Sequence, residues 1–299
     1  MKILVAAIHY PVASGRFIAN ALRRLGHDVR TVGPYTANQI WGIEVDPKWN
    51  WEPTYRISKS MEGLDLETLV SIGDWRPDLI IAADSAFTLH SVGAPHILIG
   101  QDNHVRDYQM RKWDAMFLCH TWGSRVDEPN AFWLPPCYDP TVCIDEHRER
   151  DIDVAMIGVP YAARNELAEA FHASGLKVFF GFGLLYDDYR ALYNRVKIAL
   201  NLSAMDDITN RILETMAMGC CVLTNPCRDF EKIGFRHGIE LMTFSDTQDA
   251  LAQARGLLES DTWKKIAQHG QVAALPHTWD DRMRYVLDTV RDMGLIDHA

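Results

Sequence analysis

The chain has 299 residues, of which 47% are hydrophobic and 23% charged, with a formal net charge of −10. This length suits two domains of ordinary size, and the composition excludes a disordered or fibrous chain. The acidic balance disfavours a nucleic-acid partner, because the surface as a whole repels phosphate groups. No apolar run approaches the roughly 18 residues of a membrane span. With no recognisable signal peptide, the six cysteines favour reduced thiols, and we expect a cytoplasmic protein.

The first half of the sequence alternates short apolar runs with amphipathic stretches. Apolar runs that predict buried strands cover residues 2–8, 28–32, 77–84, 96–100 and 115–119. Helical spacing marks residues 15–25 and 64–72, whereas residues 41–55 are rich in Trp, Pro and Asn and predict an irregular excursion. Strands that alternate with helices predict a parallel sheet with right-handed crossovers.

The alternation breaks at residues 134–140, where three prolines precede a charged run over residues 145–151. Proline followed by solvated charge predicts an inter-domain connection. Beyond it, strands are predicted at residues 152–158, 177–180, 198–202 and 220–224, and helices at 164–173, 186–194 and 209–218. No segment has the pattern of a β-hairpin. The fold class is therefore α/β, with two Rossmann-like domains, at residues 1–145 and 151–275, whose parallel sheets face a central cleft.

Polar residues gather in and around the loop after the predicted strand that ends near Asn201. They comprise Asn201, Asp206, Asp207, Thr209, Asn210, Arg211 and Glu214. Arg211 and Glu214 stand three positions apart and share a helix face, so a solvated ion pair is the alternative to a functional site. Carboxylates accept hydrogen bonds from sugar hydroxyls, and the forked Arg cation suits phosphate. The start of the helix adds N–H donors and a positive dipole end.

The same block resembles a known family. Asp206 and Glu214 have the spacing of the E-x7-E motif of glycosyltransferases with the GT-B fold, with Asp in place of the first Glu. Residues 211–224, R-I-L-E-T-M-A-M-G-C-C-V-L-T, resemble a stretch of the CgeB-like, spore-maturation type of these enzymes. The segment H-T-W-D-D-R at 277–282 resembles the closing motif of that group. The N-terminal half matches only generically.

This resemblance implies a GT-B glycosyltransferase that uses a nucleoside-diphosphate sugar as donor and needs no cofactor. Glu214 would hold the ribose diol, and Asp206 the hydroxyls of the donor sugar. Arg211 and Arg164 would hold the diphosphate, with the other polar residues of the block, Asn201, Thr209 and Asn210, around it. The helix predicted at residues 281–293, within the C-terminal segment 276–299, would pack back on the first domain. The resemblance favours retention of the anomeric configuration, although the sequence does not decide between retention and inversion.

A metal-dependent transferase needs a D-x-D-type loop that holds a divalent ion on oxygen ligands. Asp206 and Asp207 could serve such an ion. Asp151 and Asp153 have the D-x-D spelling but lead straight into a buried strand, so we interpret them as structural. We therefore expect no metal, with cationic side chains in the place of the ion.

The first domain should hold the acceptor and any general base. Asp84, Asp102 and His104 follow predicted strands, and a carboxylate or imidazole can take a proton from an acceptor hydroxyl. The sequence leaves the acceptor open between a saccharide, a protein, a small molecule and a modified base. Two other functions remain as alternatives. One is a non-catalytic partner protein that binds a nucleotide sugar. The other is a two-Rossmann enzyme such as a nucleotide-sugar epimerase, which the block after Asn201 argues against.

Overall fold

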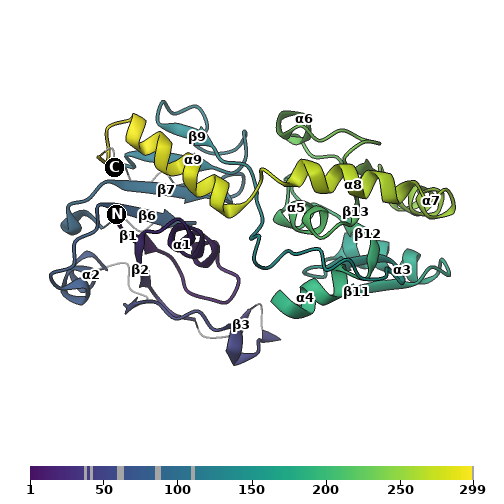
Figure 1. The fold of residues 1–299 in the computed structure, drawn as a ribbon, viewed down its shortest axis with the longest axis horizontal. Helices are drawn as coiled ribbons and strands as arrows, with labels where there is room; N and C mark the ends of the chain where they lie inside the picture. Colours follow the sequence, from purple (N-terminus) through teal and green to yellow (C-terminus); the bar gives the residue numbers. More distant parts are fainter. Residues whose placement is uncertain (37–38, 41–42, 59–63, 85–88, 109–111, 298–299) are drawn as a thin grey trace. The chain divides into compact units, whose positions relative to one another are not determined.

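The computed structural model describes residues 1–36, 39–40, 43–58, 64–84, 89–108 and 112–297 (Figure 1). It divides into two compact units, and each is considered by itself. The first comprises Met1–Pro135 together with Trp279–Ala299, and the second comprises Pro136–Thr278. Residues 136–145, which we expected in the first domain, belong to the second unit.

The first unit contains a seven-stranded sheet in the order β5-β2-β1-β6-β7-β8-β9, and all its neighbours pair in parallel. Its strands are β1 (Lys2–Ala6), β2 (Asp28–Gly33), β5 (Tyr55–Arg56), β6 (Leu79–Ala83), β7 (His96–Gly100), β8 (Ala115–Leu118) and β9 (Ala131–Trp133). Its helices are α1 (Ser14–Arg24), α2 (Leu64–Ile72) and α9 (Trp279–Asp292), with short 3-10 turns η1 (Pro47–Trp49) and η2 (His90–Val92). The predicted parallel sheet is therefore present.

Both faces of this sheet are covered, which explains why its strands are continuous apolar runs instead of alternating ones. On one face Leu4 of β1 packs in a core cluster with Ile72 of α2 and with Trp75. The C-terminal helix α9 lies along α1 (Figure 1). Between them the ring of Trp279 stacks on that of Phe17, with 6.5 Å between the ring centres.

The second unit contains a five-stranded parallel sheet in the order β11-β10-β12-β13-β14. Its strands are β10 (Ile152–Ile157), β11 (Val178–Gly181), β12 (Val196–Asn201), β13 (Cys221–Thr224) and β14 (Met242–Thr243). Its helices are α3 (Ala162–His172), α4 (Tyr186–Tyr193), α5 (Asn210–Ala217), α6 (Phe230–Ile233), α7 (Thr247–Glu259) and α8 (Thr262–Ala274). Core side chains of α3, α7 and α8 cluster on one face of the sheet, and those of α4 and α5 on the other.

The strand order fixes where each unit can bind a ligand. In the first sheet β1 lies between β2 and β6, so the chain winds away from β1 in both directions. In the second sheet β10 lies between β11 and β12 in the same way. At such a switch point the loops after the central strands diverge and leave a crevice at the carboxyl ends. The residues after β1 and β6, and those after β10 and β12, are therefore placed for binding.

Two expectations from the sequence were wrong. Strands β3 (Gln39–Ile40) and β4 (Ile43–Glu44) pair antiparallel, although no hairpin pattern was visible. Each strand has only two residues, too few to show the alternation of hydrophobic and polar residues that marks a strand. The charged run 145–151 is also not simply solvated, because Arg150 is largely buried. Its guanidinium donates to the carbonyl oxygens of Tyr193 (3.0 Å), Val196 (2.5 Å) and Met218 (2.6 Å).

Over the part of the chain that the structure describes, no helix combines the length and apolar character needed to cross a membrane. All six cysteines fall within this part, and each is buried. Asp151 and Asp153 pair with Arg195 (2.6 Å) and Lys197 (2.7 Å), in keeping with a structural role.

Candidate functional site

Two guanidinium groups converge at the carboxyl end of β10. Arg164 comes from the first turn of α3 and Arg211 from the first turn of α5. A methyl group placed on Gly158, the residue after β10, would lie 2.6 Å from Nη1 of Arg164 and 2.6 Å from Nη2 of Arg211. Only glycine leaves room for both cations at this point, which is the switch point of the second sheet.

Arg164 is held rigidly. Its side chain is buried, with Nε and Nη2 donating to the carbonyl oxygen of Leu202 (3.2 and 2.7 Å) and Nη1 donating to that of Val159 (3.1 Å). The ring of Tyr161 lies against the guanidinium at 4.3 Å. Burial, together with the neighbouring charge of Arg211, lowers the pKa of Arg164 to about 10. The residue therefore remains a cation at neutral pH, although it has lost much of its hydration. This is not the ordinary surface arginine that is the usual alternative at a helix start.

Arg211 is held by a buried amide. Nη1 of Arg211 donates to Oδ1 of Asn201 (2.7 Å), which also accepts from the hydroxyl of Thr209 (3.0 Å). The amide nitrogen of Asn201 donates to the hydroxyl of Thr224 on β13 (2.9 Å). Asn201 is 1% exposed, so its amide is not accessible to a ligand and instead fixes the position of the Arg211 side chain.

Neither guanidinium group has an ion-pair partner at contact distance among the described residues, although the charge of Asp207 acts on Arg164 and that of Arg211 acts on Glu214. Among the described residues, the hydrogen bonds of both guanidinium groups go to neutral oxygens, and no carboxylate forms an ion pair with either. Two cations held side by side repel each other, and a bound anion would offset this cost. Phosphate oxygens match the fork of a guanidinium group, and the first N–H groups of α5 point into the same end of the sheet. The arrangement is suited to a phosphate or diphosphate.

Glu214 has a separate environment. Its Oε2 accepts a hydrogen bond from the hydroxyl of Tyr189 on α4 (2.8 Å). Burial raises the pKa of Glu214, whereas the Tyr189 hydroxyl and the charge of Arg211 act in the opposite direction. Arg211 and Glu214 are thus not the solvated pair that their spacing allowed, because each has its own partner. Sequence analysis did not single out Tyr189, although it stands one helical turn before the core residue Tyr193.

Asp206 and Asp207 lie in the loop between β12 and α5. Asp206 has a left-handed backbone (φ 61°) and forms an ion pair with Arg228 (2.6 Å), which follows β13. Asp207 accepts a hydrogen bond from the hydroxyl of Ser203 in the same loop. Asn210 is the first residue of α5. The structure therefore brings the predicted residues of the second unit to one end of its sheet, but it pairs Asp206 with a cation that the sequence analysis missed.

In the first unit, two of the predicted acids lie together after neighbouring strands. Asp84 follows β6, has a left-handed backbone (φ 49°), and accepts a hydrogen bond from the hydroxyl of Tyr108 (2.5 Å). Arg106 forms ion pairs with Asp102 (3.2 Å) and, at 3.9 Å, with Asp84. Burial and the adjacent charge of Asp84 raise the pKa of Asp102, which Arg106 and His104 partly offset. Tyr10, after β1, has its pKa raised by burial and by both acids.

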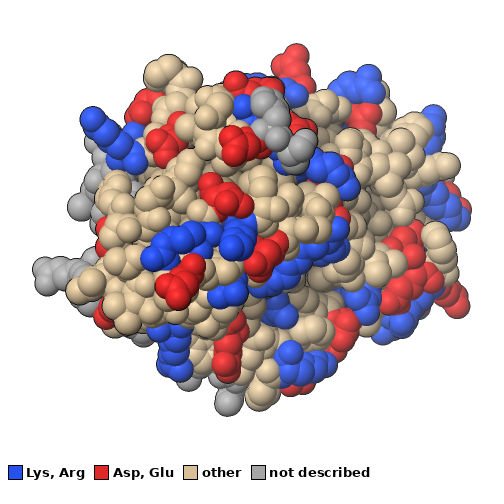
Figure 2. All heavy atoms as spheres, turned by 60° about the vertical axis from the view of Figure 1, so that its left-hand side comes forward, with Lys and Arg blue, Asp and Glu red and all other residues tan. Residues whose placement is uncertain are grey.

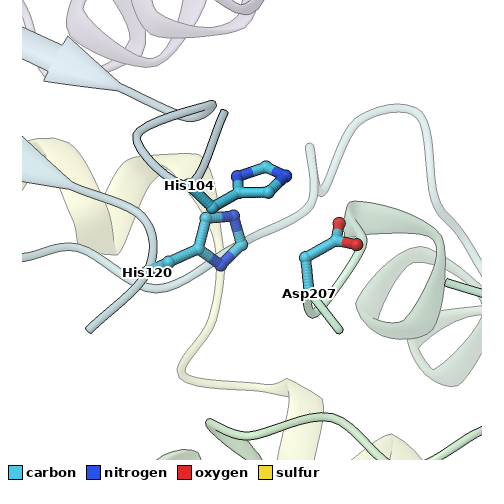
Figure 3. Close-up of side chains that lie close together, drawn as sticks. All are labelled: His104, His120 and Asp207. Atoms are coloured by element: carbon cyan, nitrogen blue, oxygen red, sulfur yellow. The ribbon is translucent and has the colours of Figure 1, made fainter. Parts of the chain in front are cut away.

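His104 belongs to a different group of side chains. Figure 3 shows its imidazole beside that of His120, and the two ring centres lie 4.3 Å apart in an edge-on arrangement. The indole of Trp122 lies 5.5 Å from His104. A ring nitrogen of each histidine lies within 4.8 Å of the other. Structural and catalytic zinc sites use three or four protein ligands, so two imidazoles alone do not make a zinc site. His120, which lacks metal-like spacing in the sequence, is brought here by the loop after β8.

A comparison with protein families finds one match to this chain. Residues 143–288 match the family described as glycosyl transferase-like. The matched segment contains Gly158, both arginines and Glu214. The prediction of a glycosyltransferase is confirmed at this level: residues 143–288, which cover most of the second unit and part of α9, are similar to the glycosyl transferase-like family. No curated protein sequence matches the chain.

Solved structures show the same fold over the whole chain. HepE from Anabaena in complex with UDP-glucose is 13% identical, with a TM-score of 0.67 over 98% of this chain and 100% of that one. A glycosyltransferase from Rickettsia africae is 13% identical, with a TM-score of 0.66 over 98% of each chain. An α-glucosyltransferase in complex with UDP and a 13-mer DNA is 12% identical, with a TM-score of 0.68 over 97% of this chain and 100% of that one. The predicted fold class, α/β with two parallel sheets as in GT-B glycosyltransferases, is confirmed. The CgeB-like subtype is not tested by these matches.

Proposed function

We propose that this enzyme transfers a sugar from a nucleoside-diphosphate sugar to an acceptor hydroxyl, and that the donor diphosphate binds at Gly158. The observation that carries the proposal is the pair of guanidinium groups of Arg164 and Arg211, which face a glycine and form no ion pair with a carboxylate among the described residues. When the bond between the sugar and the diphosphate breaks, negative charge grows on the leaving oxygen. Both cations would bind the diphosphate of the donor, and Arg211 would stabilise the growing charge more in the transition state than in the ground state.

The remaining predicted residues receive roles that fit their surroundings. Glu214 has one oxygen bonded to Tyr189, and its carboxylate is proposed to accept hydrogen bonds from the ribose diol. Thr209 and Asn210 stand at the start of α5, where backbone N–H groups can meet the phosphate. Asp206 is proposed to hold a hydroxyl of the donor sugar. Because Asp206 is bound to Arg228, this contact requires the ion pair to open or the hydroxyl to bind beside it.

Metal independence is part of the proposal. The charge that a divalent ion would supply to the diphosphate is already present on Arg164 and Arg211. We also propose that the protein belongs to the CgeB-like group, on the motifs at residues 211–224 and 277–282. We also propose a cytoplasmic location, in keeping with six cysteines that are all buried.

On the acceptor side, Asp102 is the proposed general base. Asp84 lies next to it, and a carboxyl whose pKa is raised towards neutrality exchanges protons more readily at neutral pH. His104 is the second candidate for this role. Figure 2 shows one face of the molecule, on which Lys and Arg side chains are interspersed with Asp and Glu side chains. Together with the net charge of −10, this favours a neutral acceptor over a nucleic acid.

The first experiment is a thermal-shift panel with UDP-, GDP-, ADP- and dTDP-sugars. UDP-glucose is included because HepE, which is similar in fold, has been solved in complex with it. A donor present at about 100 times its dissociation constant should stabilise the protein by about 2.7 kcal/mol. Release of the nucleoside diphosphate, followed by liquid chromatography, then tests turnover. Binding without any release would favour a non-catalytic nucleotide-sugar-binding protein.

The stereochemical course is open to a separate measurement. The resemblance to E-x7-E families favours retention of the anomeric configuration. Proton NMR of the first product formed, before it can mutarotate, distinguishes retention from inversion.

A further inference from the structure

Tyr161 is the residue directly before α3, and the sequence did not single it out. Its ring lies 4.3 Å from the guanidinium carbon of Arg164, three positions later in the chain. At 37% exposure, it is an exposed large aromatic side chain at the carboxyl end of β10. Tyr161 is the N-cap of α3, but its side chain makes no capping hydrogen bond. Helix capping therefore does not explain why a tyrosine stands here.

Arg164 needs to be held because its position is unfavourable in two respects. Its guanidinium is buried, and a second cation, Arg211, lies beside it at Gly158. Both effects lower the pKa of Arg164. Either one would push a freely rotating side chain out into solvent. The carbonyl oxygens of Leu202 and Val159 hold the edges of the guanidinium plane through its N–H groups.

Those hydrogen bonds lie in the plane of the guanidinium group and leave its faces uncovered. An aromatic ring attracts a cation through its negative face, and a planar guanidinium can stack on it while its N–H groups stay engaged. The ring of Tyr161 therefore supplies the contact that the carbonyl groups cannot. Arg211 is held differently, by a single hydrogen bond to the side chain of Asn201. Arg164 is the more firmly fixed of the two cations.

We propose that Tyr161 is a positioning residue that holds Arg164 at the diphosphate site before the donor arrives. The proposal rests on the proposed function, because it takes the ligand of the two arginines to be a diphosphate. In this arrangement Arg164 contributes to binding of the ground state, whereas the less constrained Arg211 can follow the leaving group as its charge grows. Loss of the Tyr161 ring should then raise KM for the donor and leave kcat nearly unchanged.

The test uses inorganic pyrophosphate as the probe, with affinity measured by isothermal titration calorimetry. Tyr161→Leu removes the ring and should weaken pyrophosphate binding about three- to tenfold, as expected for a cation–π contact with a partly exposed ring. Tyr161→Phe keeps the ring and should restore most of the affinity. Tyr285→Leu, at an exposed tyrosine of α9 in the first unit, is the matched control. Wild-type affinity in Tyr161→Leu would overturn the proposal. So would a Tyr161→Phe variant as weak as Tyr161→Leu, because the hydroxyl would then be the important group.

A double-mutant cycle tests whether Tyr161 acts through Arg164. In an Arg164→Gln background, Tyr161→Leu should have no further effect on pyrophosphate binding. An undiminished effect in that background would show that the ring contacts the ligand itself. The proposed function is tested separately, by whether the wild-type protein binds a nucleotide sugar. If wild-type protein binds pyrophosphate with the predicted Tyr161 dependence but no nucleotide sugar, the proposed donor is wrong and the role of Tyr161 stands.

Discussion

Gly158→Ala is the most informative single change in the second unit. The added methyl group would lie 2.6 Å from nitrogen atoms of both Arg164 and Arg211, closer than van der Waals contact allows. Arg211 can move because one hydrogen bond holds it, whereas Arg164 is held by two carbonyl groups and a ring. Gly158 does not have a positive φ, so alanine is compatible with the backbone and the effect is confined to the side chains.

The displacement of Arg211 should cost one charge-assisted hydrogen bond to the ligand, about 1.5–3 kcal/mol, or about 10- to 150-fold in donor affinity. Overpacking should also lower the free energy of unfolding by about 1–3 kcal/mol. Calorimetric titration with the donor and thermal unfolding measure the two effects. The control is Gly256→Ala in the middle of α7, where a Cβ meets nothing within 4 Å. It should stabilise the helix by up to about 1 kcal/mol and leave donor affinity unchanged. Wild-type donor affinity in Gly158→Ala would refute the assignment of the diphosphate to this point.

Four further outcomes are expected. Arg211→Ala should lower kcat/KM by about one to two orders of magnitude, and Arg211→Lys should restore only part of it, because lysine lacks the planar fork; wild-type kinetics in Arg211→Ala would place the phosphate elsewhere. Glu214→Ala should weaken donor binding without unfolding the protein, and a large fall in Tm with unchanged affinity would show Glu214 to be structural. Turnover should survive EDTA, and a loss restored by Mg²⁺ or Mn²⁺ would make the site metal-dependent. The pKa of Asp102 is higher in the folded than in the unfolded state. The free energy of unfolding therefore falls as the pH rises through the folded-state pKa, whereas Asp102 has no such effect at a pH where its carboxyl is protonated in both states. Asp102→Asn should therefore raise Tm at about pH 7 and not at about pH 3, whereas the exposed control Asp127→Asn should leave Tm nearly unchanged at both.

The parts of the fold that the sequence predicted are those with a clear hydrophobic pattern. Strands such as β1 and β6 are covered on both faces by helices, so they appear as uninterrupted apolar runs. The hairpin β3–β4 has two residues in each strand and no period to detect. The charge of Arg150 predicts exposure, but its burial depends on carbonyl groups of β12 and of the end of α5, which no local pattern reveals.

The candidate site was predicted as a set of residues and not as a geometry. The residue types near Asn201 indicate phosphate and hydroxyl binding. Their arrangement depends on the switch point between β10 and β12, which brings Arg164 to Arg211 over Gly158. Tyr161 had no such local signal, because it is the extended N-cap residue of α3 and meets Arg164 only through the turn into the helix. The pairing of Asp206 with Arg228 joins two loops and has no such signal.

The most direct test of the central claim is calorimetric titration of the best donor from the panel, in the presence of EDTA, against two proteins. One is the wild type and the other carries both Arg164→Gln and Arg211→Gln. With Arg164 and Arg211 supplying the charge, the wild type should bind without metal, and its affinity should fall as salt rises. Loss of two charge-assisted contacts at about 1.5–3 kcal/mol each should weaken binding in the double variant by at least about 100-fold. Equal affinity in a correctly folded double variant, or wild-type binding that appears only when a divalent metal is added, would contradict it.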